Sequence, residues 1–80
     1  MEKYSGKRLD DAFRQWSGQL ETINNFKLTK ENIKYYAWLD VLSNSDVKLF
    51  EKRRHKIYKK CREHCEMMLE RIRDLKKGRN

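Results

Sequence analysis

Apolar side chains recur along the first third of the chain at steps of three and four residues, the period of an amphipathic α-helix. The pattern predicts a helix from Lys7 to Ile23, which Ser5 would cap and which Asn24 and Asn25 would end. Its apolar positions are Leu9, Ala12, Phe13, Trp16, Leu20 and Ile23. These side chains share one face, so we expect that face to pack against the rest of the protein.

A second helix is predicted from Lys30 to Leu42, with Thr29 as its N-cap and Glu31 in its first turn. Its apolar positions are Ile33, Tyr35, Tyr36, Ala37, Trp38, Leu39, Val41 and Leu42. They cover nearly every direction around the helix axis, which is typical of a helix buried on several sides. Part of this surface could instead form an oligomer interface.

A long third helix is predicted from Asp46 to Lys77, after a turn over residues 43–46 in which Ser45 is the expected N-cap. Its apolar positions keep the helical spacing without a break. They are Val47, Phe50, Ile57, Tyr58, Cys61, Cys65, Met68, Leu69, Ile72 and Leu75. A helix of this length measures roughly 48 Å, and two shorter helices would cover its apolar stripe only if laid end to end. We therefore expect the C-terminal half of the stripe to pair two chains as a homodimer. The residues of this association surface are Cys65, Met68, Ile72 and Leu75.

The sequence thus predicts an all-α fold of three helices, two short N-terminal helices and one long amphipathic C-terminal helix, in a single domain over residues 1–80. The absence of proline and the presence of only three glycines favour helices throughout. The longest largely apolar run, residues 35–39, is far shorter than the roughly 20 residues of a membrane span, and the N-terminus carries no apolar signal core. We expect no membrane association and a cytoplasmic location, where the two cysteines stay reduced.

Positive charge is concentrated in one segment of the chain. Lys and Arg number 20 against 12 Asp and Glu, and this net charge of +8 favours a polyanionic partner. The segment from Lys52 to Arg62 contains seven Lys or Arg residues and no acidic residue. The remaining thirteen basic and twelve acidic residues nearly balance, so one surface carries almost the whole excess.

The outward face of the predicted third helix changes sign along its length. Its first half presents Lys52, Lys56 and Lys59, whereas its second half presents acidic residues. The acidic residues are Glu63, Glu66, Glu70 and Asp74. Arg54 falls within the apolar stripe and would need a bend, a snorkelling side chain or an acidic partner. The basic half is suited to lie along phosphates, while the acidic half is kept away from them.

We therefore predict a non-enzymatic nucleic-acid-binding protein that contacts phosphates through this basic surface, with RNA slightly preferred over DNA. The expected phosphate-contacting residues are Lys52, Arg53, Lys56, Lys59, Lys60 and Arg62. His55, Tyr58 and exposed tyrosines of the second helix are candidates for base stacking. A sequence-specific helix-turn-helix is disfavoured, because the turn has no glycine and because Asp46 and Glu51 would face the DNA.

Two alternatives to nucleic-acid binding stay open: a small regulatory protein that binds and modulates a protein partner through its helices, and a solvated surface without a partner. Zinc binding by Cys61, His64 and Cys65 is disfavoured, because His55 projects about 120° from Cys61 and one chain does not readily close a tetrahedral set. We interpret both cysteines as packing residues and expect no metal or cofactor. Without a glycine-rich phosphate loop, an HExxH pattern or a third group that orients the Cys/His pair, we expect no enzymatic activity.

Overall fold

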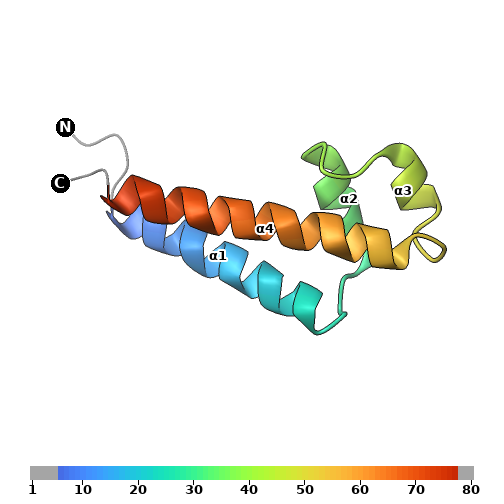
Figure 1. The fold of residues 1–80 in the computed structure, drawn as a ribbon, viewed down its shortest axis with the longest axis horizontal. Coiled ribbons are helices and arrows are strands. Elements are labelled where there is room, and N and C mark those ends of the chain that lie inside the picture. Colours follow the sequence, from blue (N-terminus) through green and yellow to red (C-terminus); the bar gives the residue numbers. More distant parts are fainter. Residues whose placement is uncertain (1–5, 78–80) are drawn as a thin grey trace.

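The computed structural model describes residues 6–77, which form four α-helices. They are α1 (Gly6–Asn24), α2 (Lys30–Trp38), α3 (Asn44–Lys48) and α4 (Arg54–Lys77) (Figure 1). α1 and α4 run antiparallel side by side along the longest dimension of a molecule that measures 47 × 22 × 17 Å. α2 and α3 lie near the N-terminal part of α4 (Figure 1). Residues 6–77 contain no strand, which confirms the all-α class, but the structure has four helices where three were predicted.

α1 is helical from Gly6, the first described residue, and ends at Asn24, one residue after the predicted end. Its buried side chains, Leu9, Trp16 and Ile23, are spaced seven residues apart, or about two turns, so they form one stripe that faces the core. Ser5, the expected N-cap, lies outside the described residues. The apolar spacing alone was therefore sufficient to locate this helix.

α2 begins where predicted but ends at Trp38, four residues before the predicted end. Thr29 is its N-cap as expected, because the Thr29 side chain accepts a hydrogen bond from the Asn32 backbone and the Asn32 side chain accepts one from the Thr29 backbone, both at 3.1 Å. At the other end Asp40 adopts a left-handed conformation with φ 63°. Its N–H bonds to the Ala37 carbonyl and terminates the helix. Apolar residues continue past this point, which is why the pattern extended the helix too far.

The predicted long third helix is in fact two helices, α3 and α4, separated by turns over residues 49–53. Ser43, not Ser45, is the N-cap of α3, and Asp46 completes its capping box. Asp46 also binds Arg53 and Lys60, so one carboxylate ties α3 to the start of α4. The prediction of an unbroken helix was wrong because the apolar spacing continues across the break, and this polar cluster joins the two helices on either side of it.

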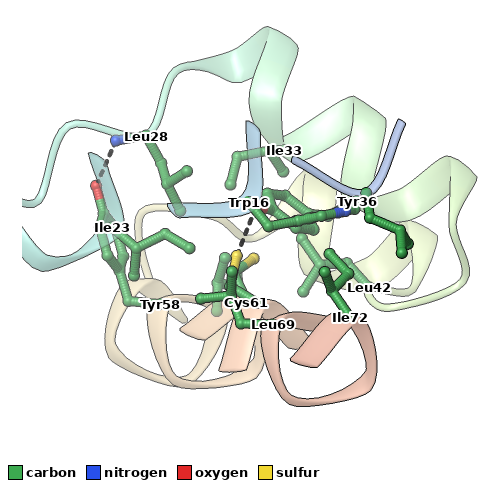
Figure 2. Packing of buried hydrophobic residues seen from close by; sticks show 13 residues of the cluster. Trp16, Ile23, Leu28, Ile33, Tyr36, Leu42, Tyr58, Cys61, Leu69 and Ile72 are labelled. Carbon is green, nitrogen blue, oxygen red and sulfur yellow. Dashed lines mark hydrogen bonds between the residues drawn. The ribbon is translucent and has the colours of Figure 1, made fainter. Parts of the chain in front are cut away.

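The core lies between α1, α2 and α4 and is closed by two buried tyrosines (Figure 2). Tyr36 is fully buried, and its hydroxyl lies 3.2 Å from Gln19 Oε1 and 3.3 Å from Cys65 Sγ. Burial, reinforced by the neighbouring Cys65, raises the pKa of Tyr36 well above its usual value. The Tyr58 hydroxyl accepts a hydrogen bond of 3.0 Å from the Leu28 backbone and fixes the segment that connects α1 to α2. Every buried polar group named here therefore has a partner.

The C-terminal half of the apolar stripe on α4 is covered by α1 of the same chain. Cys65 and Ile72 are buried, Met68 packs against the core, and only Leu75 of the predicted association surface is exposed. Lys76 bonds to Asp10 and joins the two helices near their outer ends. The reason for predicting a dimer, an uncovered stripe, therefore does not hold.

Among the described residues no helix is long and apolar enough to cross a membrane.

Candidate nucleic-acid interface

The basic segment predicted from the sequence occupies the turn before α4 and the first nine residues of that helix. Lys52, His55, Lys56 and Lys59 are exposed, and Arg62 is half-buried beside the end of α1. Arg62 Nε donates a 3.1 Å hydrogen bond to Asn24 Oδ1, which holds the guanidinium at the surface. The structure thus presents a group of cationic side chains at the end of the molecule where α4 begins.

Two of the predicted phosphate-contacting residues are held by Asp46. Arg53 Nη1 lies 3.0 Å from Asp46 Oδ1, and Lys60 Nζ lies 3.0 Å from Asp46 Oδ2. Asp46 itself is only 1% exposed. The hydrogen bond from the Ser43 backbone, followed by those from Lys60 and Arg53, holds the pKa of this carboxyl far below its usual value despite its burial. The two cations therefore compensate a buried charge and are less available for phosphates.

Arg54, which the helical projection placed in the apolar stripe, is exposed at the first position of α4. Its guanidinium carbon lies 5.8 Å from the Phe50 ring centroid and 5.9 Å from that of Tyr58. The chain bends before α4, so Arg54 does not have to point into the apolar stripe. Arg54 covers two aromatic rings by cation–π contacts, so its charge serves the fold and also adds to the positive surface.

The N-terminus of α4 has neither a capping side chain nor an acidic residue in its first turn, the two features that normally stabilise a helix start. Arg53 stands at the N-cap position, where its carbonyl accepts the hydrogen bond from Ile57, and no acidic residue lies in the first turn. That turn instead contains Arg54, His55 and Lys56. Cations at this end oppose the helix dipole at a cost of about 0.3–1 kcal/mol each. The side chains and the dipole thus combine into one positive region that favours an anion.

Tyr58 is removed from the candidate stacking residues because it is only 2% exposed. Its ring packs against those of Phe26 and Phe50, with centroids 5.3 and 6.5 Å away. Phe26, by contrast, is 62% exposed and lines a surface hollow of about 370 Å³. The residues around this hollow are Phe26, His55, Tyr58, Lys59 and Arg62. Phe26 is not among the residues that the sequence predicts for stacking, although it is an aromatic residue in the polar stretch after α1.

The tyrosines of α2 were also candidates for stacking, and the structure separates them. Tyr36 is buried in the core, whereas Tyr35 is partly exposed. The Tyr35 ring stacks on Trp38, with centroids 6.1 Å apart and an angle of 23° between the planes. Neither ring lines the hollow beside the basic segment. Tyr35 and Trp38 therefore form a separate aromatic surface on α2.

The Cys/His cluster of α4 is part of the core. Cys61 and Cys65 are fully buried free thiols, and burial raises the pKa of Cys61 to about 12 and also raises that of Cys65. His64 packs edge-on against Trp16 at 5.2 Å, and burial together with Arg71 lowers its pKa. Across residues 6–77, no group of three or more His, Cys, Asp or Glu side chains is placed to hold a metal ion.

A second hollow, of about 330 Å³, lies between α2 and the α3 region. Its apolar lining comes from Ile33, Val47 and Phe50, and its lysines are Lys30, Lys34 and Lys48, with Glu51 as the one acidic residue. Positive charge around an apolar surface suits an acidic partner that also carries an apolar side chain. This hollow shares no lining residue with the one beside Phe26.

Comparison of the chain with protein-family models, with curated proteins and with solved structures found no match. We therefore infer the function from the chemistry of these surfaces.

Proposed function

We propose that this protein binds nucleic acid without catalysing a reaction, through phosphate contacts from the exposed cations at the start of α4, with RNA slightly preferred over DNA. The observation that carries the proposal is the concentration of seven Lys or Arg residues, with no acid, in one eleven-residue segment. Of these, Lys52, Arg54, Lys56 and Lys59 are exposed, and Arg62 is at the surface beside them, but the Arg54 guanidinium already lies over the Phe50 and Tyr58 rings.

The fold gains little from these exposed cations. Like charges repel one another, and Lys56 in addition opposes the dipole of α4. Phosphates along a nucleic-acid strand would neutralise the cluster and release counterions, which is the main source of sequence-independent affinity. With Arg53 and Lys60 engaged by Asp46, we expect about four phosphate contacts rather than six.

The test is a charge reversal of the exposed lysines, Lys52→Glu with Lys56→Glu and Lys59→Glu. Binding of fluorescein-labelled RNA and DNA oligonucleotides is measured by anisotropy over a series of salt concentrations. For the parent, log affinity should fall against log salt with a slope of about 3–4 for duplex DNA and about 3 for single strands. In the reversed variant both affinity and slope should collapse while the circular dichroism spectrum is retained.

The matched control is Lys30→Glu with Lys34→Glu and Lys48→Glu, which changes the net charge by the same amount around the α2–α3 hollow. This control should keep most of the affinity, because the loss in the first variant is local. Equal losses in both variants would reduce the proposal to general attraction between opposite charges. Absence of binding by the parent at about 50 mM salt, where phosphate contacts are strong, would overturn it.

The hollow between α2 and α3 supports the second candidate, a small regulatory protein that binds an acidic protein segment. Its lysines and apolar lining match a partner that presents carboxylates beside one apolar side chain. The same two variants separate the candidates. A protein partner at this hollow would be lost with the reversal at Lys30, Lys34 and Lys48, and kept with the reversal on α4.

A further inference from the structure

Phe26 occupies a backbone conformation that bulky residues rarely adopt. Its φ is 56°, in the left-handed region, and it lies two residues after Asn24, the last residue of α1. The Phe26 N–H bonds to the Ile23 carbonyl and the Lys27 N–H to the Thr22 carbonyl, both at 3.0 Å. This pair of bonds is the Schellman motif, whose left-handed position is usually filled by Gly or sometimes Asn.

The end of α2 provides an internal comparison, because the same motif recurs there with Asp40. The Asp40 N–H bonds to the Ala37 carbonyl, the Val41 N–H bonds to the Tyr36 carbonyl, and φ of Asp40 is 63°. Short polar side chains such as Asp tolerate this conformation, whereas a β-carbon with a bulky ring costs roughly 1–2 kcal/mol. The chain therefore carries an unfavourable residue at the end of α1, where a small or polar residue would close the helix more easily.

Core packing does not account for the phenylalanine. The ring is 62% exposed, although it contacts Tyr58 with centroids 5.3 Å apart and an angle of 39° between the planes. Strained residues of this kind concentrate at functional sites. The exposed ring borders the hollow of about 370 Å³ in which Lys59 and Arg62 are also found. An aromatic surface beside cations is the combination that binds single-stranded nucleic acid.

We propose that this hollow takes an unpaired nucleobase, which stacks on Phe26 while Lys59 and Arg62 contact the adjoining phosphates. A base inside a duplex already stacks on its neighbours and cannot reach the ring, so the site selects single strands or unpaired loops. Arg62 is held in position for this contact by its hydrogen bond to Asn24 Oδ1. This inference rests on the proposed function and narrows it to unpaired nucleic acid.

The experiment replaces Phe26 by residues that suit its backbone. Phe26→Gly and Phe26→Asn remove the ring and relieve the left-handed strain, so both variants should fold, as checked by circular dichroism and thermal melting. Binding is measured with an unstructured RNA of about ten nucleotides and with a duplex of the same sequence. We expect a loss of about 5- to 150-fold for the single strand and little change for the duplex.

Two matched variants identify the cause. Phe26→Tyr keeps an aromatic face and should keep the affinity for single strands. Trp38→Ala removes a still more exposed ring, 77% exposed, which does not line the hollow, and should also leave the affinity unchanged.

The outcomes separate this inference from the proposed function. If the Gly and Asn variants bind the single strand as well as the parent, or lose single-strand and duplex binding equally, base stacking on Phe26 is overturned and phosphate binding by α4 stands. If Trp38→Ala produces the same loss, the stacking surface lies on α2 and the inference is overturned. If the parent binds neither ligand at low salt, both the inference and the proposed function fail.

Discussion

The two halves of α4 have the same apolar spacing but differ in the number of their charged residues and in the contacts that these residues make. Residues 54–65 contain five Lys or Arg and one acidic residue, whereas residues 66–77 contain four and three. In the second half Lys76 bonds to Asp10, and both Arg73 and Lys76 lie over the Phe13 ring at 5.8 Å. In the first half, Lys60 and Arg62 are held by Asp46 and Asn24, whereas Lys56 and Lys59 are exposed at the surface. The comparison separates cations that hold helices together from cations that the fold does not require.

The halves also differ in what covers them. α1 lies along the second half and reaches His64 and Arg62 in the first half, which also meets α2, the α3 region and the segment that connects α1 to α2 (Figure 1). Shorter elements leave hollows at their edges, and both the Phe26 hollow and the α2–α3 hollow occur at this end. The regular packing against α1 thus stabilises the fold, and both surfaces proposed for recognition lie at the irregular end.

The largest expected effect comes from breaking the packing of the second half. Ile72 is buried against α1, so Ile72→Asp should cost more than about 4 kcal/mol of unfolding free energy and abolish the fold. Leu75, one turn further along, is 38% exposed, and Leu75→Asp should cost less than about 1 kcal/mol. Urea denaturation followed by circular dichroism measures both. Similar costs would contradict the position of α1.

The same pair of variants tests the predicted homodimer by sedimentation equilibrium. Because α1 covers the stripe within one chain, we expect a monomer of 9.9 kDa at micromolar concentration. A dimer that Leu75→Asp dissociates while helicity is kept would restore the predicted association surface at its exposed edge.

Asp46 is the next most sensitive position, because it supports the irregular end. Asp46→Ala should cost about 2–4 kcal/mol, since it removes the α3 capping box and leaves Arg53 and Lys60 without their carboxylate. Asp46→Asn keeps a side-chain oxygen for the Ser43 backbone but not the charge, so its cost should be intermediate. If both variants cost less than about 0.5 kcal/mol, the carboxylate would not be what ties α3 to α4.

The same carboxylate gives a pH dependence with a definite sign. Its pKa in the folded protein is lowered below the ordinary value of 3.8, so the unfolded chain binds the proton more tightly. The stability that Asp46 provides is therefore present above about pH 4 and is lost as the pH falls towards the lower, folded-state value. The parent should lose more stability than Asp46→Asn on acidification from about pH 5 to pH 2.

The two halves of α4 and the elements that cover them also show how much of the fold the sequence could predict. The spacing of apolar residues located α1, the start of α2 and the helix over residues 54–77, because local periodicity decides such elements. It could not locate the break at residues 49–53, which the contact between Asp46 and Lys60, fourteen positions apart, bridges. Nor could it separate a stripe covered by α1 from one covered by a second chain, since both arrangements need the same apolar residues.

For the candidate interface, the sequence showed where the cationic residues are concentrated but not which of them are free to contact phosphates. The segment from Lys52 to Arg62 was evident from composition, whereas the engagement of Arg53 and Lys60 by Asp46 requires the fold. The sequence predicts Tyr58 as a stacking residue although its side chain is buried, and the proposed role of Phe26 depends on a positive φ and an adjoining hollow. In each case, the surroundings of the side chain in the fold, and not the residue type, decide whether it is available to a ligand.

Cys61 and Cys65 lie near the middle of α4, and replacing them should reduce stability less than the changes at Ile72 and Asp46. Cys61→Ala with Cys65→Ala removes two buried thiols and should cost about 1–2 kcal/mol, while nucleic-acid affinity stays unchanged. In the parent, the raised pKa values and burial should make alkylation by iodoacetamide slow until the protein unfolds. Stoichiometric zinc in the purified parent, absent from the double variant, would contradict the interpretation of both residues as packing residues.

The smallest change in stability is expected at Lys56, where stability and binding should move in opposite directions. Lys56 lies exposed in the first turn of α4, so Lys56→Glu places a favourable charge near the positive end of the helix dipole and should raise the unfolding free energy by about 0.3–1 kcal/mol. The same change removes one phosphate contact and should reduce the salt slope by about one. The equivalent change in the acidic half, Glu70→Lys, is the control for charge reversal on α4 and should not weaken binding. Thermal melts and anisotropy titrations on the same samples measure both quantities. A loss of affinity accompanied by a gain in stability would mean that the cation at this position serves the ligand and not the fold, whereas a loss of both would assign Lys56 to the structure.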